Sequence, residues 1–255
     1  MSRKRVLVIS DFHSGHNLGL THPSDDFDDG TTHYLVRRTI WEWYAPLVKR
    51  LKPNIVIVNG DCIDGDGKKS GGTEQLTTDR IKQCKMAVKT LKVIPGKPKF
   101  FMSYGTGYHT GNDEDFENII ADKIGAEKIG AEDTIDVNGL LINYRHHIGR
   151  SGIPHGRHTA VAKERLWNLM WAERGEYPKA DVFIRSHVHY HAFCGGPGWL
   201  AMTTAGLQGY GSKYGARVVT GTVDVGMVHF DIWSRDKWTW ESHILRFPAE
   251  EPLEA

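Results

Sequence analysis

Three short apolar segments, separated by amphipathic ones, constrain the fold of this chain most strongly. Residues 5–10 (RVLVIS), 54–60 (NIVIVNG) and 99–105 (KFFMSYG) are almost wholly apolar, as expected for strands that are covered on both faces. Between them, residues 33–52 and 73–93 place apolar side chains at helical intervals. Because strands that alternate with helices require crossover connections, we predict a partly parallel sheet with helices on its faces.

The second half of the chain is richer in strands. Residues 134–147 predict two strands about an Asn-Gly turn at Asn138 and Gly139, which is a strong short-range hairpin signal. Further elements are a helix at 158–177, a buried strand at 181–187 and strand-like runs at 199–205, 216–233 and 237–247. We therefore predict two packed sheets flanked by helices, in a single domain over residues 1–247. The tail from 248 to 255 is expected to be flexible.

The composition is that of an ordinary globular protein. The 255 residues are 40% hydrophobic and 25% charged, and Lys+Arg at 32 nearly balances Asp+Glu at 31. This balance excludes the global basic field of a nucleic-acid coat protein but leaves room for local patches. The three cysteines are odd in number and lack C-x-x-C spacing, so we predict neither a disulfide framework nor a thiolate zinc site, and expect a cytoplasmic location. No segment is long enough for a membrane span or a signal peptide, so we expect no membrane partner.

Aspartates and histidines follow the predicted strands. The first strand runs into Asp11 and His13, and because strand side chains alternate with period 2, we expect both to lie on one face. The later candidates are Asp61, His109, His146, His147, His187 and His189. Ligands bind at the carboxyl ends of strands in open α/β sheets, so these side chains should converge on one site. Convergent Asp and His are typical of a metal site, and their number predicts two divalent ions bridged by a carboxylate such as Asp61.

Each motif has a simpler interpretation when it is taken alone. A single Asp or His after a strand is more often a cap or a hydrogen-bonding residue than a metal ligand. The alternating histidines at 187 and 189 are equally consistent with a polar strand face. The glycine-rich GTGYHTG segment at 105–111 lacks the third glycine of a dinucleotide-binding loop. The co-occurrence of five such blocks, each after a predicted strand, favours the metal site.

The five blocks in this order resemble the calcineurin-like metallophosphoesterase superfamily. The blocks are Asp11-Phe-His13, Gly60-Asp61-Cys62-Ile63-Asp64, the loop to His109, the lone His146 or His147, and Ser186-His187-Val188-His189. The resemblance covers residues 11–189. It implies a four-layer α/β/β/α sandwich of two mixed sheets, which agrees with the elements predicted from the pattern. It also implies two divalent metal ions, for which Mn is the best candidate and Fe, Zn, Ni and Mg are alternatives.

The resemblance also implies a role for each matching residue. Asp11, His13 and His189 would hold one ion, and Asp61 would bridge both. His187 and the lone histidine would hold the second ion, with His146 preferred to His147. His109 would contact the scissile phosphate and protonate the leaving oxygen.

Three departures from the family pattern limit this transfer. The asparagine that precedes the catalytic histidine has no plain counterpart, so Thr106 is the candidate replacement ligand and the second ion should be held less firmly. Ser186 stands where the family usually has glycine, which is a mild steric change. Gly65 follows Asp64 where phosphoprotein phosphatases have arginine, which argues against a phosphatase of the usual Ser/Thr type.

The resemblance implies a phosphoesterase that uses a metal-activated hydroxide at a dinuclear site. We expect a phosphodiester substrate, which favours a nuclease or a nucleotide phosphodiesterase. A phosphomonoesterase with the same site, and a non-catalytic binding protein on the same fold, are the alternatives. Candidate contacts to a nucleic-acid or nucleotide substrate, which are equally consistent with a solvated rim, are Tyr108, Arg145, Arg150, Arg157, His158, Tyr210, Lys213 and Tyr214.

Overall fold

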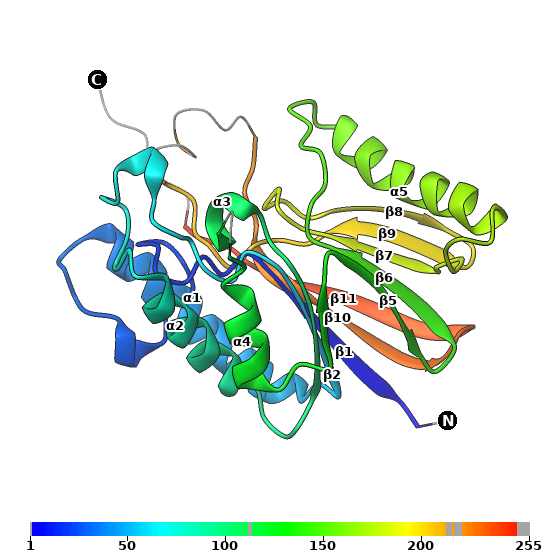
Figure 1. Cartoon of the computed structure of the whole chain (residues 1–255), viewed down its shortest axis with the longest axis horizontal. Coiled ribbons are helices and arrows are strands. Elements are labelled where there is room, and N and C mark those ends of the chain that lie inside the picture. Colours follow the sequence, from blue (N-terminus) through cyan, green and yellow to red (C-terminus); the bar gives the residue numbers. More distant parts are fainter. Residues whose placement is uncertain (1, 112–113, 213–215, 217–220, 249–255) are drawn as a thin grey trace.

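Two β-sheets pack face to face and carry helices on their outer surfaces (Figure 1). The computed structural model describes residues 2–111, 114–212, 216 and 221–248. The first sheet contains, in spatial order, β11 (Lys237–Leu245), β10 (Val225–Ser234), β1 (Lys4–Ile9), β2 (Ile55–Asn59), β3 (Lys99–Ser103) and β4 (Lys128–Gly130). The second contains β5 (Glu132–Val137), β6 (Leu140–Arg145), β7 (Val182–Arg185), β9 (Trp199–Thr203) and β8 (Ala192–Gly196). The helices are α1 (Thr32–Leu51), α2 (Arg80–Lys92), α3 (Gly107–Thr110), α4 (Glu117–Ile124) and α5 (Gly156–Glu173), with 3-10 turns η1 (Pro23–Asp25) and η2 (Lys68–Ser70).

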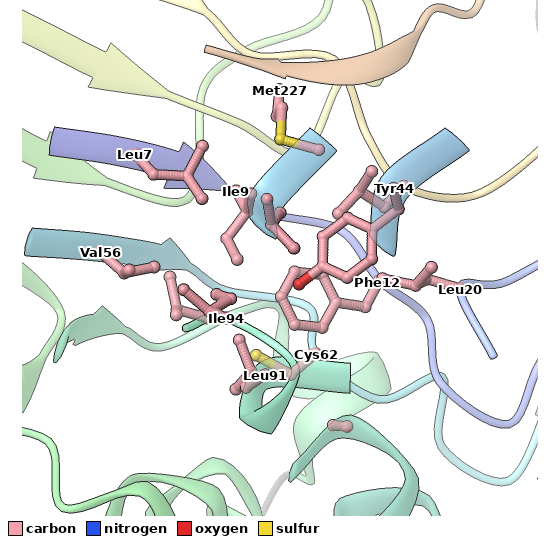
Figure 2. Close-up of a cluster of buried hydrophobic side chains, with 14 of the residues drawn as sticks. Leu7, Ile9, Phe12, Leu20, Tyr44, Val56, Cys62, Leu91, Ile94 and Met227 are labelled. Carbon is pink, nitrogen blue, oxygen red and sulfur yellow. The ribbon is translucent and has the colours of Figure 1, made fainter. Parts of the chain in front are cut away.

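Three hydrophobic clusters fill the three spaces between the four layers. The first lies between the first sheet and helices α1, α2 and α4. Figure 2 shows this cluster, in which Leu7 and Ile9 of β1 meet Tyr44 of α1 and Leu91 of α2. The second cluster lies between the two sheets, and the third lies under α5 on the second sheet. The predicted α/β/β/α architecture of two mixed sheets is therefore confirmed.

The predicted parallel core of the first sheet is present. Strands β1, β2, β3 and β4 pair in parallel, whereas β10 and β11 add antiparallel strands at one edge. The predicted hairpin forms from β5 and β6, with Asn138 at φ 53° and Gly139 at φ 88°. Positive φ at both turn residues matches the right-handed twist of the strands, which explains why Asn-Gly is found there. All the parallel strands end at the same edge, where the candidate ligands lie.

The helix predicted over 73–93 is shorter in the structure. Helix α2 begins at Arg80 because the Asp79 carboxylate accepts hydrogen bonds from the backbone N–H groups of Ile81 and Lys82 and so caps the helix. The preceding segment serves the site instead, since Gln75 donates to the carboxylate of Asp64. Sequence reasoning also missed β4, β8, α3 and α4, each eight residues or shorter. Elements this short carry too few residues for a periodic pattern to identify.

Two predictions concern parts of the chain that the structure only partly describes. The flexible tail was predicted over 248–255, and residues 249–255 lie outside the described residues. The strand-like run over 216–233 begins in a region that is only partly described, and its ordered strand, β10, starts at Val225. Among the described helices, none is long and apolar enough to cross a membrane.

A buried arginine fixes the segment that follows the first strand. Arg37 of α1 is fully buried, and its guanidinium donates to the carboxylates of Asp26 and Asp29 at 2.7 and 3.3 Å and to the backbone carbonyl of Asn17 at 2.8 Å. These bonds tie residues 17–29 to the first layer of helices.

Replacing Arg37 by alanine should lower the free energy of unfolding by roughly 3 kcal/mol, because the Asp26 carboxylate, whose side chain is only 8% exposed, would lose its cation. The side chain of the neighbouring Arg38 is 58% exposed and donates to the exposed Glu42 carboxylate and to the Tyr34 hydroxyl, so Arg38→Ala should leave the urea midpoint unchanged. Urea unfolding of both variants measures the difference. Equal losses in the two variants would contradict the anchoring role of Arg37.

Candidate metal centre

The loops that follow the strands bring the predicted Asp and His side chains together at one edge of the two sheets. They form three overlapping groups in which the potential ligand atoms lie within 4.8 Å of one another. The groups are Asp11, His13 and His189; His13, Asp61 and His109; and Asp61, His146 and His187. Because His13 and Asp61 each belong to two groups, the set forms one continuous cluster with room for more than one ion.

The backbone at the candidate ligands adopts an unusual conformation. Of the seven described non-glycine residues with positive φ, five are candidate ligands, with φ between 46° and 72°: Asp11, His13, Asp61, His187 and His189. Strand β1 ends at Ile9, so strand periodicity is not what aligns Asp11 with His13, and that part of the sequence argument is wrong. Left-handed backbone costs a non-glycine residue on the order of 1 kcal/mol, and such strain is concentrated at functional sites.

Asp11, His13 and His189 form the first half of the cluster. The Asp11 Oδ1 atom lies 3.2 Å from His189 Nε2, and His189 Nε2 lies 3.2 Å from His13 Nε2. The other ring nitrogen of His13, Nδ1, is bonded to the Asp64 carboxylate at 2.8 Å. A carboxylate on the far nitrogen fixes the ring of a ligand histidine and increases its basicity.

Asp61 forms the second half of the cluster with His146 and His187. Asp61 Oδ2 lies 3.0 Å from His146 Nε2 and 4.0 Å from His187 Nδ1. The far nitrogen of His146 is bonded to the backbone carbonyl of Asn59 at 2.7 Å, which orients Nε2 toward the cluster. Thr106 donates to the Asp61 carboxylate from its backbone N–H at 2.6 Å and from its hydroxyl at 2.8 Å. The Thr106 hydroxyl is also 3.4 Å from His187 Nδ1, so it lies where a replacement ligand would be needed.

The buried donor atoms of the cluster are suited to divalent cations. Asp11 Oδ1 and His146 Nε2 are buried, and although each lies within 3.2 Å of another candidate ligand atom, neither has a hydrogen bond of good geometry with a described residue. Buried polar atoms normally have a partner, so two such atoms facing a cluster of other ligands indicate that the partner is an ion. Mixed carboxylate and imidazole donors suit Mn, Fe or Zn. The chemistry of these residues therefore fits a metal centre.

The electrostatics of the cluster favour positive charge. Burial opposes protonation of His146, but the carboxylates of Asp61 and Asp11 outweigh it and raise the pKa of His146 to about 10. Burial likewise favours the neutral form of Asp11, yet the neighbouring His189 outweighs it and lowers the pKa of Asp11 to about 2. The same field attracts a divalent cation, which would displace the proton from His146 on binding.

Residues outside the ligand set hold the cluster in place, and sequence reasoning assigned them no role. Glu117 of α4 is fully buried and accepts hydrogen bonds from the backbone N–H groups of Cys62 at 2.8 Å and Gly105 at 2.7 Å. Burial raises the pKa of Glu117 to about 7 although these two bonds oppose the shift. The carboxylate thus joins the loops that carry Asp61 and Thr106. Only Asp64, through the G-D-x-x-D motif, had a sequence signal; Glu117 had none.

The two adjacent histidines of the fourth block have different environments. His146 is buried within the cluster, whereas His147 is exposed and belongs to none of the groups among the described residues. The His147 ring instead packs against the ring of His187, with 4.8 Å between the ring centroids. The geometry therefore favours His146 as the ligand.

A cavity of about 340 Å³ opens from the cluster. His13, His109 and His189 line its floor, and Tyr108, Arg150 and Tyr210 lie among the residues of its wall. The His109 Nδ1 atom is bonded to the backbone carbonyl of Asp64 at 2.9 Å. A carbonyl can only accept, so Nδ1 carries a proton and Nε2 is left for exchange with a bound molecule.

Other predicted substrate contacts lie elsewhere or outside the described residues. Arg145 is bonded to the carboxylates of Glu132 and Glu164 at 3.1 and 2.8 Å and lines a separate hollow under α5. Arg157 lies over the Tyr190 ring, and His158 is bonded to the backbone carbonyl of Phe193, so neither lines the cavity. Lys213 and Tyr214 fall outside the described residues.

Comparisons with known proteins find similarity in structure alone. No protein-family model matches the chain, and no curated protein matches it. Solved structures that match include a mutant Vps29 from Entamoeba histolytica, with 14% identity and a TM-score of 0.46 over 95% of this chain and 99% of that one. A novel archaeal phosphodiesterase matches with 14% identity and a TM-score of 0.48 over 94% and 99%. The phosphoesterase YfcE from E. coli matches with 12% identity and a TM-score of 0.43 over 88% and 90%.

A phosphodiesterase and a phosphoesterase are thus among the proteins that match this chain in structure. Similarity at this level concerns the fold and does not extend to activity or partners.

Gly105 tests how closely the loop after β3 must approach the loop that carries Asp61. A Cβ atom there would lie 2.3 Å from both the backbone nitrogen and Oδ1 of Asp61, so Gly105→Ala must displace that carboxylate. We expect the affinity for Mn, measured by calorimetry, to fall by about tenfold or more. Gly149→Ala is the matched control, since no atom lies within 4 Å of a Cβ there. Unchanged Mn affinity in Gly105→Ala would show that the Asp61 carboxylate is not a ligand.

Proposed function

We propose that this protein is a metal-dependent phosphoesterase with a dinuclear site and that phosphodiesters are its substrates. The observation that carries the proposal is the set of three ligand groups that overlap through His13 and Asp61, beside a cavity that His13, His187 and His189 line. Asp11, His13 and His189 would hold one ion, and His146 and His187 the second, with Asp61 between them. Mn is the best candidate for both. When bound, the ions neutralise the phosphate oxygens and lower the pKa of a water that serves as the nucleophile.

The second ion should be held less firmly than the first. Its proposed protein ligands are His146, His187 and the shared Asp61, and the Thr106 hydroxyl, 3.4 Å from His187 Nδ1, would stand in for the missing asparagine. That hydroxyl already donates to both oxygens of Asp61. We therefore propose unequal affinities, with activity that depends on added Mn.

His109 is the proposed proton donor to the leaving oxygen. It lines the cavity beside the ligands, and its Nδ1 proton is held by the Asp64 carbonyl. This bond orients the ring and leaves Nε2 as the atom that can give a proton to the substrate. His109 shares a ligand group with His13 and Asp61 but belongs to neither of the two groups assigned to the ions. Removing it should therefore leave those two groups intact.

The shape of the cavity favours a diester over a monoester. Its wall continues beyond the ligands to Tyr108, Arg150 and Tyr210, which leaves room for a substituent on each side of a phosphate. A half-exposed Tyr210 offers a stacking surface for a base, whereas Tyr108 has the Lys69 ammonium over its ring, and Arg150 supplies a cation for a phosphate. These features support a nuclease or a nucleotide phosphodiesterase. A phosphomonoesterase would use the same ligands without this wall.

Hydrolysis of bis-p-nitrophenyl phosphate and of p-nitrophenyl phosphate, each with and without added Mn, tests the proposal. Faster Mn-dependent turnover of the diester is the expected result. Faster turnover of the monoester would assign the protein to the phosphomonoesterases. Mn binding without turnover of either ester would support a non-catalytic binding protein, and an absence of metal binding would refute the site itself.

The adjacent histidines test the second ion. We expect His146→Gln to lose about one equivalent of Mn by equilibrium dialysis and to lose Mn-dependent turnover, because it removes a ligand nitrogen. His147→Gln should keep both, since His147 is exposed and outside the ligand groups. The reverse result would exchange the roles of the two residues.

The leaving group tests His109. His109→Ala should lower kcat by about 10²–10⁴-fold on an alkyl phosphodiester, whose leaving oxygen needs a proton, and by much less on an aryl ester. Its Mn content should remain that of the wild type. An equal loss on both esters would count against proton donation.

A further inference from the structure

A second group of metal-ligating side chains lies on the first sheet, apart from the candidate metal centre. It consists of His229 on β10 and of Glu241 and His243 on the edge strand β11, and Glu241 lies directly across from His229 in the antiparallel pair. One potential ligand atom from each residue lies within 4.8 Å of those from the other two. None of the three belongs to the groups of the candidate metal centre. We call these residues the edge-strand cluster.

The edge-strand cluster lies on the face of the sheet that is turned away from the second sheet. Along β10, Val228 and Phe230 point into the space between the two sheets, so His229 points to the opposite face. The side chains of His229 and His243 are only 8% and 11% exposed, whereas that of Glu241 is 65% exposed. Two nearly buried imidazoles therefore lie next to a carboxylate at the surface, where an ion from solvent has access.

The hydrogen bonds of the two imidazoles are incomplete. His229 Nδ1 lies 2.9 Å from His243 Nε2, and this one bond leaves the other nitrogen of each ring. The nearest carboxylate oxygens of described residues are 3.6 Å from His243 Nδ1, on Glu241, and 3.9 Å from His229 Nε2, on Asp231. Both distances exceed that of a hydrogen bond. Two ligand atoms on one tetrahedral zinc ion are roughly 3.3 Å apart, so the spacing of these donors suits a shared ion.

The charges around the cluster leave both imidazoles in the form that binds metals. Burial lowers the pKa of both histidines, and Arg5 adds to each shift, so both rings are neutral at pH 7. The Arg5 guanidinium is bonded to the Asp231 carboxylate at 2.7 and 2.6 Å, and this pair has no net charge. The Glu241 carboxylate balances Arg50, the other cation that acts on the cluster. The surroundings therefore carry no net positive charge that would repel a divalent cation.

We propose that the edge-strand cluster binds a transition-metal ion, with Zn²⁺ as the best candidate. His229 and His243 each contribute a ring nitrogen, Glu241 contributes a carboxylate oxygen, and water completes the coordination. Imidazole and carboxylate donors together suit Zn better than Mg or Ca. The ion would join the edge strand β11 to β10 through their side chains. This proposal is independent of the proposed function, because the two sites share no residue.

Calorimetric titration of the full chain with Zn²⁺ provides the first test. We expect His243→Gln to bind one equivalent of Zn less than the wild type, whatever number the candidate metal centre binds. His158→Gln is the matched control, since His158 is exposed and belongs to none of the ligand groups. Equal numbers of Zn in the wild type and in His243→Gln, or the same loss in His158→Gln, would overturn the proposal.

A variant at the surface and a spectroscopic measurement exclude misfolding as the cause of a loss. Glu241→Gln should raise the Zn dissociation constant of the cluster by about tenfold, because it removes an anionic ligand, whereas the exposed Glu173→Gln on α5 should not change it. In nuclear magnetic resonance of ¹⁵N-labelled histidine, Zn should shift a ring nitrogen of both His229 and His243. Equal constants in the two glutamine variants would overturn the proposal. Ring resonances that stay in place at saturating Zn would also overturn it and would leave the two histidines as a hydrogen-bonded pair.

Discussion

The buried carboxylate of Asp61 is the group on which the candidate site depends. It lies in the loop after β2, is bonded by Thr106 after β3, and faces His146 after β6 and His187 after β7. An ionised carboxylate in so buried a place requires compensating positive charge or hydrogen bonds. The protein supplies two donors from Thr106 and surrounds the rest with imidazoles. Four loops from both sheets therefore have to meet around one anion, which fixes how the sheets are placed relative to each other.

Backbone hydrogen bonds, as well as side chains, hold the loops that meet around Asp61. The chain continues the parallel pairing of β1 and β2 beyond the strands, since the N–H groups of Asp11 and His13 donate to the carbonyls of Gly60 and Asp61 at 2.9 and 3.1 Å. These bonds hold Asp11 and His13 in left-handed conformations that isolated residues would avoid. Glu117 acts in the same way on the next pair of loops, through Cys62 and Gly105. The strain at the ligands is thus offset by hydrogen bonds outside the ligand set.

The four-layer arrangement also separates the ligand cluster from helix α5. The ligand cluster occupies the edge where the parallel strands end, while helix α5 covers the outer face of the second sheet (Figure 1). Arg145 shows the division clearly, because its backbone follows into the cluster at His146 while its side chain pairs with Glu132 and Glu164 beneath α5.

The sequence by itself determined the strands of the parallel core, the Asn-Gly hairpin, the four-layer class and the residue types at the strand ends. These features depend on local patterns, since apolar runs, turn residues and short motifs act over a few neighbouring positions. Only the tertiary structure decided which candidates converge. His146 and His147 are adjacent and chemically identical in the sequence, but His146 contacts Asn59 and Asp61 of the other sheet and is buried, whereas His147 is exposed. The roles of Glu117 and Arg145 also depend on the tertiary structure. The direction of a side chain depends on contacts between segments far apart in the chain, and no local pattern records those contacts.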